Sequence, residues 1–100
     1  MITNTGQDVN IKLIPSDPVT NTIIIIYCVS SNGVSIPYKS SWRRIYPKKN
    51  KIEDITYHNV SSYRCSPLDI DNYIEATVTY QQQNTQITKK VMSNMVKVSR

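Results

Sequence analysis

Apolar and polar residues alternate with a period of two along much of the chain, which is typical of β-strands that bury one face. In residues 73–82 the apolar positions are Ile74, Ala76, Val78 and Tyr80. Residues 9–13 alternate in the same way, whereas residues 22–29 form a continuous apolar run rich in β-branched side chains. Such a run predicts a strand covered on both faces, or one at the core of a sandwich.

Further strands are predicted at residues 40–46, 60–65 and 86–98, the last with a bulge at Ser93 and Asn94. Pro47 ends one strand, residues 48–51 predict an exposed turn, and a short weak element follows around Ile52 and Ile55. About seven strands separated by regular turn signals predict an all-β fold, an antiparallel β-sandwich.

The composition agrees with strands rather than helices. The chain has 100 residues, with one alanine and two leucines, which leaves little material for a helical bundle. We expect a single domain over residues 1–100, one monomeric module of a larger protein. Phenylalanine is absent, so Trp42 and seven tyrosines supply the aromatic packing.

The polar N-terminus contains no secretory signal, and the apolar run is too short for a membrane-spanning helix, which needs about 20 residues. Cys28 and Cys65 show no metal-binding spacing. We expect free thiols in a reducing compartment; the alternative is a disulfide between the two cysteines. The expected location is cytoplasmic, peripheral to a membrane or to the cytoskeleton.

Positive charge is concentrated in one segment. The formal net charge is +5, and no acidic residue lies between Asp17 and Glu53. That interval holds Lys39, Arg43, Arg44, Lys48, Lys49 and Lys51. Such asymmetry favours an anionic partner, whether phospholipid headgroups, nucleic acid or an acidic protein surface.

Cys28 precedes Trp42 by 14 residues, and Asp69-x-Asp71-x-Tyr73 follows further along the chain. These three landmarks resemble those of immunoglobulin-like domains, in which the last has the spacing of the D-x-G-x-Y corner. The resemblance implies that the tyrosine hydroxyl pins the crossover between the sheets. Asp71 replaces the usual glycine, and Glu75 stands where the second cysteine would be, so the inter-sheet disulfide of that family cannot form.

Longer strings resemble the immunoglobulin-like repeats of the plant auxin-induced-in-root-cultures microtubule-associated protein and of related protist cytoskeletal and signalling proteins. NGVSIPYKSSWRR is similar to their "EG-S-x-Y-x-W-x-R" segment, residues 63–74 to "Y-x-x-S-x-D-x-G-x-Y-I", and residues 93–98 to the closing "S-N-x-V-x-V" strand. The similarity spans residues 9–98. It implies a non-enzymatic targeting module and identifies no ligand.

Two interpretations of the segment SWRRIYPKKNK remain open. Trp42 is expected to anchor the core, the alternative being an exposed ring that stacks on nucleic acid or enters lipid. Period two places Arg44 on the side of Trp42 and Arg43 on the opposite face. The charges are either a solvated sheet edge or an anion-binding site. The candidate ligands of an anionic headgroup are Arg43, Arg44, Lys48, Lys49, Lys51, Lys89 and Lys90.

Catalytic and metal chemistry find little support. The only histidine, His58, has no partner at recognisable spacing, and Asp69 and Asp71 alone provide too few oxygen ligands for calcium. We therefore expect no enzyme, no cofactor and no metal. Nucleic acid is disfavoured because no aromatic stripe interleaves with the charges. The leading hypothesis is recognition of an anionic membrane surface, a phosphoinositide in particular. The alternative is a protein–protein interaction or spacer domain.

Overall fold

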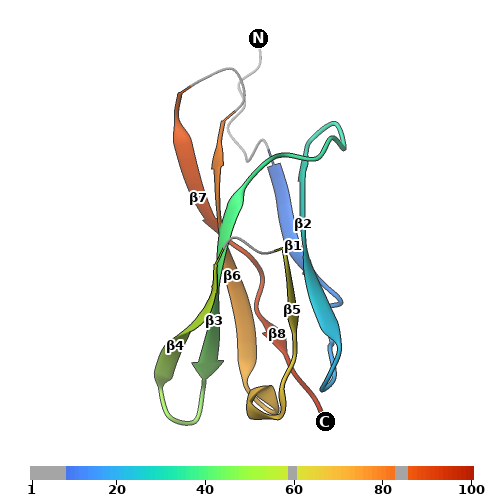
Figure 1. Cartoon of the computed structure of the whole chain (residues 1–100), viewed down its shortest axis with the longest axis vertical. Helices are drawn as coiled ribbons and strands as arrows, with labels where there is room; N and C mark the ends of the chain where they lie inside the picture. The colour runs from blue at the N-terminus through green and yellow to red at the C-terminus, as the bar shows by residue number, and fades with distance from the viewer. Residues whose placement is uncertain (1–8, 59–60, 83–85) are drawn as a thin grey trace.

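The computed structural model describes residues 9–58, 61–82 and 86–100. Two antiparallel sheets pack face to face as an immunoglobulin-like β-sandwich, which confirms the predicted fold class (Figure 1). One sheet has the strand order β1-β2-β5, and the other has the order β4-β3-β6-β7, with β8 also paired to β6. The strands are β1 (Val9–Ile14), β2 (Ile23–Ser30), β3 (Lys39–Tyr46), β4 (Lys51–His58), β5 (Ser62–Arg64), β6 (Tyr73–Gln81), β7 (Thr88–Met92) and β8 (Val96–Lys97).

The predicted strand positions agree closely with these bounds, with one exception. The weak element expected around Ile52 and Ile55 is the eight-residue strand β4, which pairs with β3 along its whole length. A register shift between Ser41 and Trp42 interrupts that pairing. Because β4 pairs with β3 at the end of the strand order, it is an edge strand of the larger sheet, and the hydrophobic pattern underestimated its length.

The core lies between the two sheets and consists mainly of inward strand residues, with Ile36, Cys65 and Val98 from the connecting segments. Period-two alternation places Ile74, Ala76, Val78 and Tyr80 there, as predicted. Trp42 is 1% exposed and packs against the ring of Tyr63, with 5.7 Å between ring centroids. The prediction that Trp42 anchors the core is confirmed.

The last predicted strand is interrupted at the expected position. β7 ends at Met92, and β8 begins at Val96. Between them the Ser93 hydroxyl accepts a hydrogen bond from the Ala76 amide, and the Asn94 side-chain oxygen accepts one from the Leu13 amide of β1. The side chain of Asn94 therefore joins the edges of the two sheets.

The two cysteines are far apart in the fold. Cys65 donates its backbone N–H to the carbonyl of Thr22, and Cys28 lies six residues further along β2. At about 3.3 Å per residue the separation is roughly 20 Å, whereas a disulfide needs Cα atoms within about 7 Å. Both residues are buried free thiols, so the question left open by the sequence is settled against an internal disulfide.

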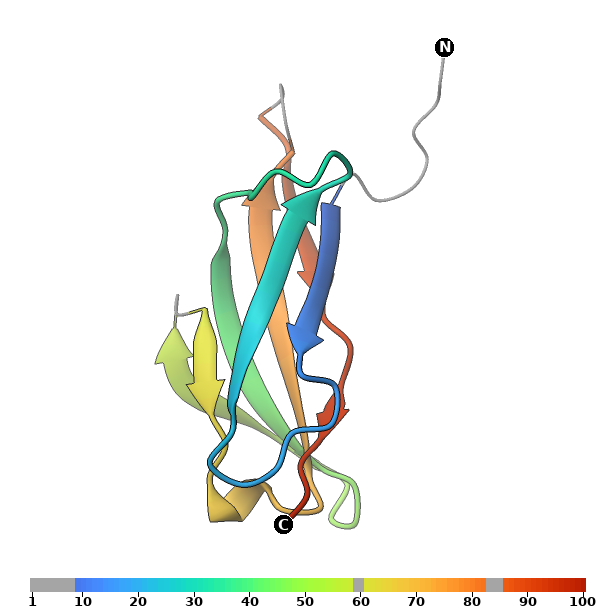
Figure 2. The same ribbon diagram turned by 90° about the vertical axis from the view of Figure 1, so that its right-hand side faces the viewer.

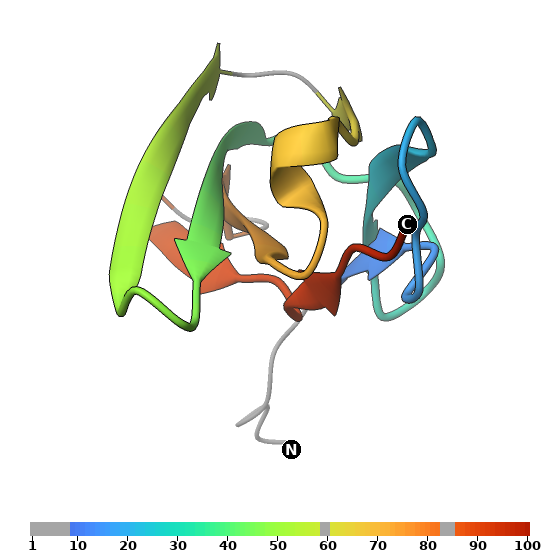
Figure 3. The same ribbon diagram turned by 90° about the horizontal axis from the view of Figure 1, so that it is seen from below.

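One end of the sandwich gathers segments that are distant in sequence. The β3–β4 turn, the 3-10 turn η1 (Pro67–Asp69) and the C-terminus all lie there (Figures 1 and 2). Figure 3 views the molecule from this end and shows the turn on the side of the larger sheet. The candidate site is built at this end.

Candidate anion-binding site

The β3–β4 turn (residues 47–50) and the first residue of β4 carry three exposed lysines, which we call the turn lysines. The Lys49 amide donates to the Tyr46 carbonyl across 3.2 Å, and Asn50 has a φ of 50°. Asparagine tolerates this left-handed conformation better than most residues, which suits it to the turn. Lys48, Lys49 and Lys51 are all exposed, in agreement with the predicted exposed turn.

Tyr46 holds two of these lysines close to the sheet. The ammonium nitrogens of Lys49 and Lys51 each lie 5.3 Å from the centre of the Tyr46 ring. The negative face of an aromatic ring attracts such cations, by about 0.5–1 kcal/mol at an exposed site. Two positive charges are therefore kept near one another without a carboxylate between them.

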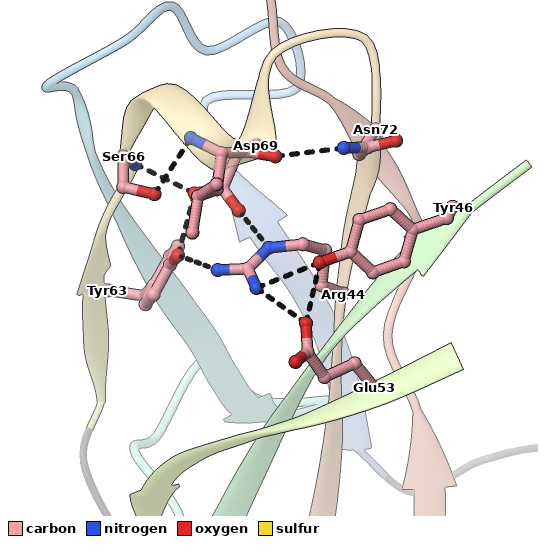
Figure 4. A network of polar contacts seen from close by, with 8 residues as sticks. Arg44, Tyr46, Glu53, Tyr63, Ser66, Asp69 and Asn72 are labelled. Atoms are coloured by element: carbon pink, nitrogen blue, oxygen red, sulfur yellow. Dashed lines mark hydrogen bonds and ion pairs between the residues drawn. The ribbon is translucent and has the colours of Figure 1, made fainter. Parts of the chain in front are cut away.

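Beneath the turn, Arg44 lies inside the protein, where it is 8% exposed. Its Nε donates to Asp69 Oδ1 at 2.5 Å, its Nη1 to Glu53 Oε1 at 2.8 Å, and its Nη2 to the Tyr63 hydroxyl at 3.2 Å (Figure 4). The Tyr46 hydroxyl donates to the same oxygen of Glu53 at 2.6 Å. Arg44 thus joins the two sheets, and its burial does not fit its predicted role as a ligand of an external anion.

Burial and hydrogen bonds shift the pKa values of several members of this network. Burial alone would lower the pKa of Arg44, but hydrogen bonds to Asp69, Tyr46 and Tyr63 outweigh it and raise the pKa above its ordinary value. Hydrogen bonds from Tyr46 and Arg44 lower the pKa of Glu53. Burial, reinforced by Asp69, raises the pKa of Tyr63 to about 12. The guanidinium and the Glu53 carboxylate are therefore charged at neutral pH, and the phenol is neutral.

Asp69 is fully buried and organises the corner before β6. Its Oδ2 accepts from the Tyr63 hydroxyl at 2.6 Å and from the Ser66 amide at 2.8 Å, and the Ser66 hydroxyl accepts from Leu68 to complete a capping box. Asp71 has a φ of 67°, a left-handed conformation that a glycine would adopt without strain.

The implied tyrosine corner differs in detail. Within the described residues, the Tyr73 hydroxyl has no hydrogen bond, and Asp69 carries the connections at this corner. Ala76, not Glu75, faces inward opposite Trp42. Glu75 lies on the outer face of the sheet, so the sequence register that places it at a core cysteine is one residue off.

Arg43 lies on that outer face, as the period-two pattern predicted. Its Nε donates to Glu75 Oε1 at 2.8 Å, and the two side chains are 33% and 11% exposed. This ion pair occupies the guanidinium and leaves it less available to an external anion than an unpaired lysine.

Lys89 and Lys90 are not part of the turn. They pair with Tyr80 and Thr79 of β6, whereas the turn lies beyond Ile45, which pairs with Tyr73. Six residues of strand separate these positions, or roughly 20 Å. Lys90 shares the outer face with Arg43, but the two residues are four β6 positions apart. The structure therefore brings together Lys48, Lys49 and Lys51 and leaves the other four candidates outside the cluster.

The three turn lysines make no salt bridge within the described part of the chain. Lys51 lies close enough to Glu53 to contribute to its lowered pKa. Across residues 9–58, 61–82 and 86–100, no three His, Cys, Asp or Glu side chains are arranged to hold a metal ion. Nor does any helix among those residues have the length and apolar character to cross a membrane.

Sequence reasoning missed all four partners of Arg44, which are Tyr46, Glu53, Tyr63 and Asp69. One signal was available: Arg44 was placed on the side of Trp42, and an arginine facing a core requires carboxylate partners. No protein-family model, curated protein or solved structure gives a significant match to the chain.

Proposed function

We propose that this protein is a non-enzymatic targeting module that recognises an anionic membrane surface, a phosphoinositide headgroup in particular, through the β3–β4 turn. The observation that carries the proposal is the contrast in pairing within one segment. Arg43 and Arg44 have carboxylate partners, whereas Lys48, Lys49 and Lys51 are exposed and form no salt bridge with any described residue. Unpaired ammonium groups on an ordered turn suit a phosphate-bearing surface.

The mechanism is electrostatic attraction followed by contact of the ammonium groups with headgroup phosphates. Each basic residue near an anionic membrane contributes about 1 kcal/mol, and the attraction falls off within a Debye length. Tyr46 keeps Lys49 and Lys51 on the sheet, so less side-chain entropy is lost when they meet phosphate. The resemblance to repeats of cytoskeletal and signalling proteins supports a targeting role.

The test is co-sedimentation with liposomes of equal total charge, some carrying a single phosphoinositide and others only phosphatidylserine. We expect binding to prefer one phosphoinositide and to be lost in a Lys48/Lys49/Lys51→Ala variant. The charge-matched control is Lys39/Lys89/Lys90→Ala, which removes three lysines at the far end of the larger sheet.

Absence of binding to all liposomes would reject the proposal. Equal loss of liposome binding in both triple variants would show that binding depends on the net charge of the molecule and not on a defined site at the turn. Binding that follows the total charge of the liposome, with no headgroup preference, would support recognition of an anionic membrane surface and reject specificity for a phosphoinositide.

A further inference from the structure

The outer face of the β1-β2-β5 sheet is apolar at its centre. Ile23, Ile25 and Tyr27 of β2 point outward, with 45%, 45% and 39% of their surface exposed, and Ile14 of β1 pairs beside Ile25 and is 37% exposed. Figure 2 looks onto this sheet and shows β2 between β1 and β5. The four side chains form a continuous stripe, which we call the β2 stripe.

The other sheet shows that this stripe is not a general property of the fold. On its central strands the outward residues are mostly polar, among them Ser41, Arg43, Thr77 and Thr79. Antiparallel sheets with one solvated face normally alternate in this way. A strand that is apolar on both sides is typical of one covered on both faces, and β2 is covered on only one by the rest of the described chain.

Two cations border the β2 stripe and are held in place. The Lys12 ammonium lies 5.4 Å from the centre of the Tyr27 ring, on the β1 side. On the β5 side, Arg64 pairs with Ile23, and its Nη1 donates to the Asn21 carbonyl at 3.1 Å. The other bordering residues of the described strands are Asn10 and Ser62, so no carboxylate of these strands lies on this face.

We propose that this face docks an acidic amphipathic segment of another protein, whose apolar side chains cover the β2 stripe and whose carboxylates meet Lys12 and Arg64. Charge complementarity selects this occupant. A second copy of the chain would bring Lys12 and Arg64 against cations of its own kind, because both borders of the face are positive.

A membrane is a poorer occupant of this face. The β3–β4 turn lies at one end of the long axis, whereas the β2 stripe runs along the side of the molecule (Figure 2). A flat bilayer that contacts the turn leaves most of the stripe uncovered. The docking proposal is therefore independent of the membrane proposal, and together they describe a module that holds a protein partner beside a membrane.

The test is selection from a random 16-residue peptide library displayed on phage, followed by fluorescence anisotropy on the enriched peptides. We expect enrichment of Asp and Glu together with apolar residues. Affinity should fall at least tenfold in an Ile23/Ile25→Thr variant, which keeps β-branched side chains in the strand, and at least tenfold in a Lys12/Arg64→Glu variant. The matched control Lys39/Lys90→Glu reverses two charges on the other sheet and should change affinity less than twofold.

Four results would overturn the proposal, provided that thermal melts show the variants folded. One is failure to enrich any peptide that distinguishes the wild type from the Ile23/Ile25→Thr variant. Another is binding that is insensitive to Lys12/Arg64→Glu. A dimer in sedimentation velocity that dissociates in the Ile23/Ile25→Thr variant would assign the face to a second copy. Loss of liposome binding in that same variant would assign it to a membrane.

Discussion

Arg44 and the lysines of the β3–β4 turn lie within eight residues of one another in the sequence, yet they occupy opposite environments. Arg44 is 8% exposed and is shared between two carboxylates and two tyrosine hydroxyls. Lys48, Lys49 and Lys51 are exposed, and none forms a salt bridge with the described residues. Positive residues that are neighbours in the sequence therefore have different roles here: Arg44 is part of the folded interior, and the three lysines are surface charges.

The division follows from the chemistry of the two side chains. A guanidinium offers five donors in a rigid planar fork and can satisfy several acceptors at once in a buried position. An ammonium group is strongly hydrated and favours a solvated turn. Tyr46 connects the two environments, because its hydroxyl donates to Glu53 inside and its ring attracts Lys49 and Lys51 outside.

Removing the buried charge of Arg44 should have the largest effect on the free energy of unfolding. Arg44→Met leaves Asp69 buried without its cation, and such loss of one partner costs about 3–5 kcal/mol. Arg43→Met removes the same charge from the neighbouring, more exposed position and breaks a single ion pair, so it should cost less than Arg44→Met. Urea unfolding of both variants measures the difference. Equal costs would show that Arg44 is no more structural than Arg43.

Alkaline pH should weaken the interior network through Cys65 and Tyr63. Burial, followed by the charge of Asp69, raises the pKa of Cys65 from 9.0 to about 11, and burial raises the pKa of Tyr63 from 10.0 to about 12. A raised native pKa contributes stability that is complete below the unfolded value and is lost as pH rises to the native value. Thermal melts should therefore show falling stability between about pH 9 and pH 12, with Tyr63→Phe flattening the upper part of the decline. An unchanged slope in that variant would contradict the assignment.

The hydrophobic pattern predicted most of the strands because period-two alternation reports burial directly. Residues 73–82 were assigned almost to the residue, as were residues 9–13 and 40–46. β4 was underestimated because an edge strand with Lys51, Glu53 and Asp54 has a weak apolar signal. Its pairing with β3 depends on tertiary contacts that a local pattern does not contain.

The candidate site was predicted only in part. The exposed turn could be read from Pro47 and the lysines around Asn50, since these residues determine local backbone and solvation. The engagement of Arg44 could not, because Glu53 and Asp69 lie 9 and 25 residues away along the chain and meet it only after the sheets pack. Charge counting along a sequence does not distinguish paired from unpaired cations.

Glu53 lies on the boundary between the two environments, so Glu53→Gln should affect both stability and anion binding. The variant loses the charge that Arg44 and Tyr46 contact, so we expect the free energy of unfolding to fall, by less than in Arg44→Met. The same change removes a negative charge near Lys51 and should strengthen binding to anionic liposomes. Because hydrogen bonds lower the pKa of Glu53, its contribution is present above its ordinary pKa of 4.5 and is lost as pH falls below it. Weaker liposome binding in a folded Glu53→Gln variant would contradict the role of the turn.

The turn lysines should have the smallest effect on stability and the largest effect on binding to anionic liposomes. Lys48/Lys49/Lys51→Ala removes the attraction of two lysines to Tyr46 but also relieves repulsion among three cations, so the free energy of unfolding should change by less than about 0.5 kcal/mol. Urea titration at low and high salt measures this, with Lys39/Lys89/Lys90→Ala as the control. A loss above about 1.5 kcal/mol would make the turn structural, like Arg44. A near-zero change would leave its three exposed charges without a role in folding, as a surface for an external anion requires.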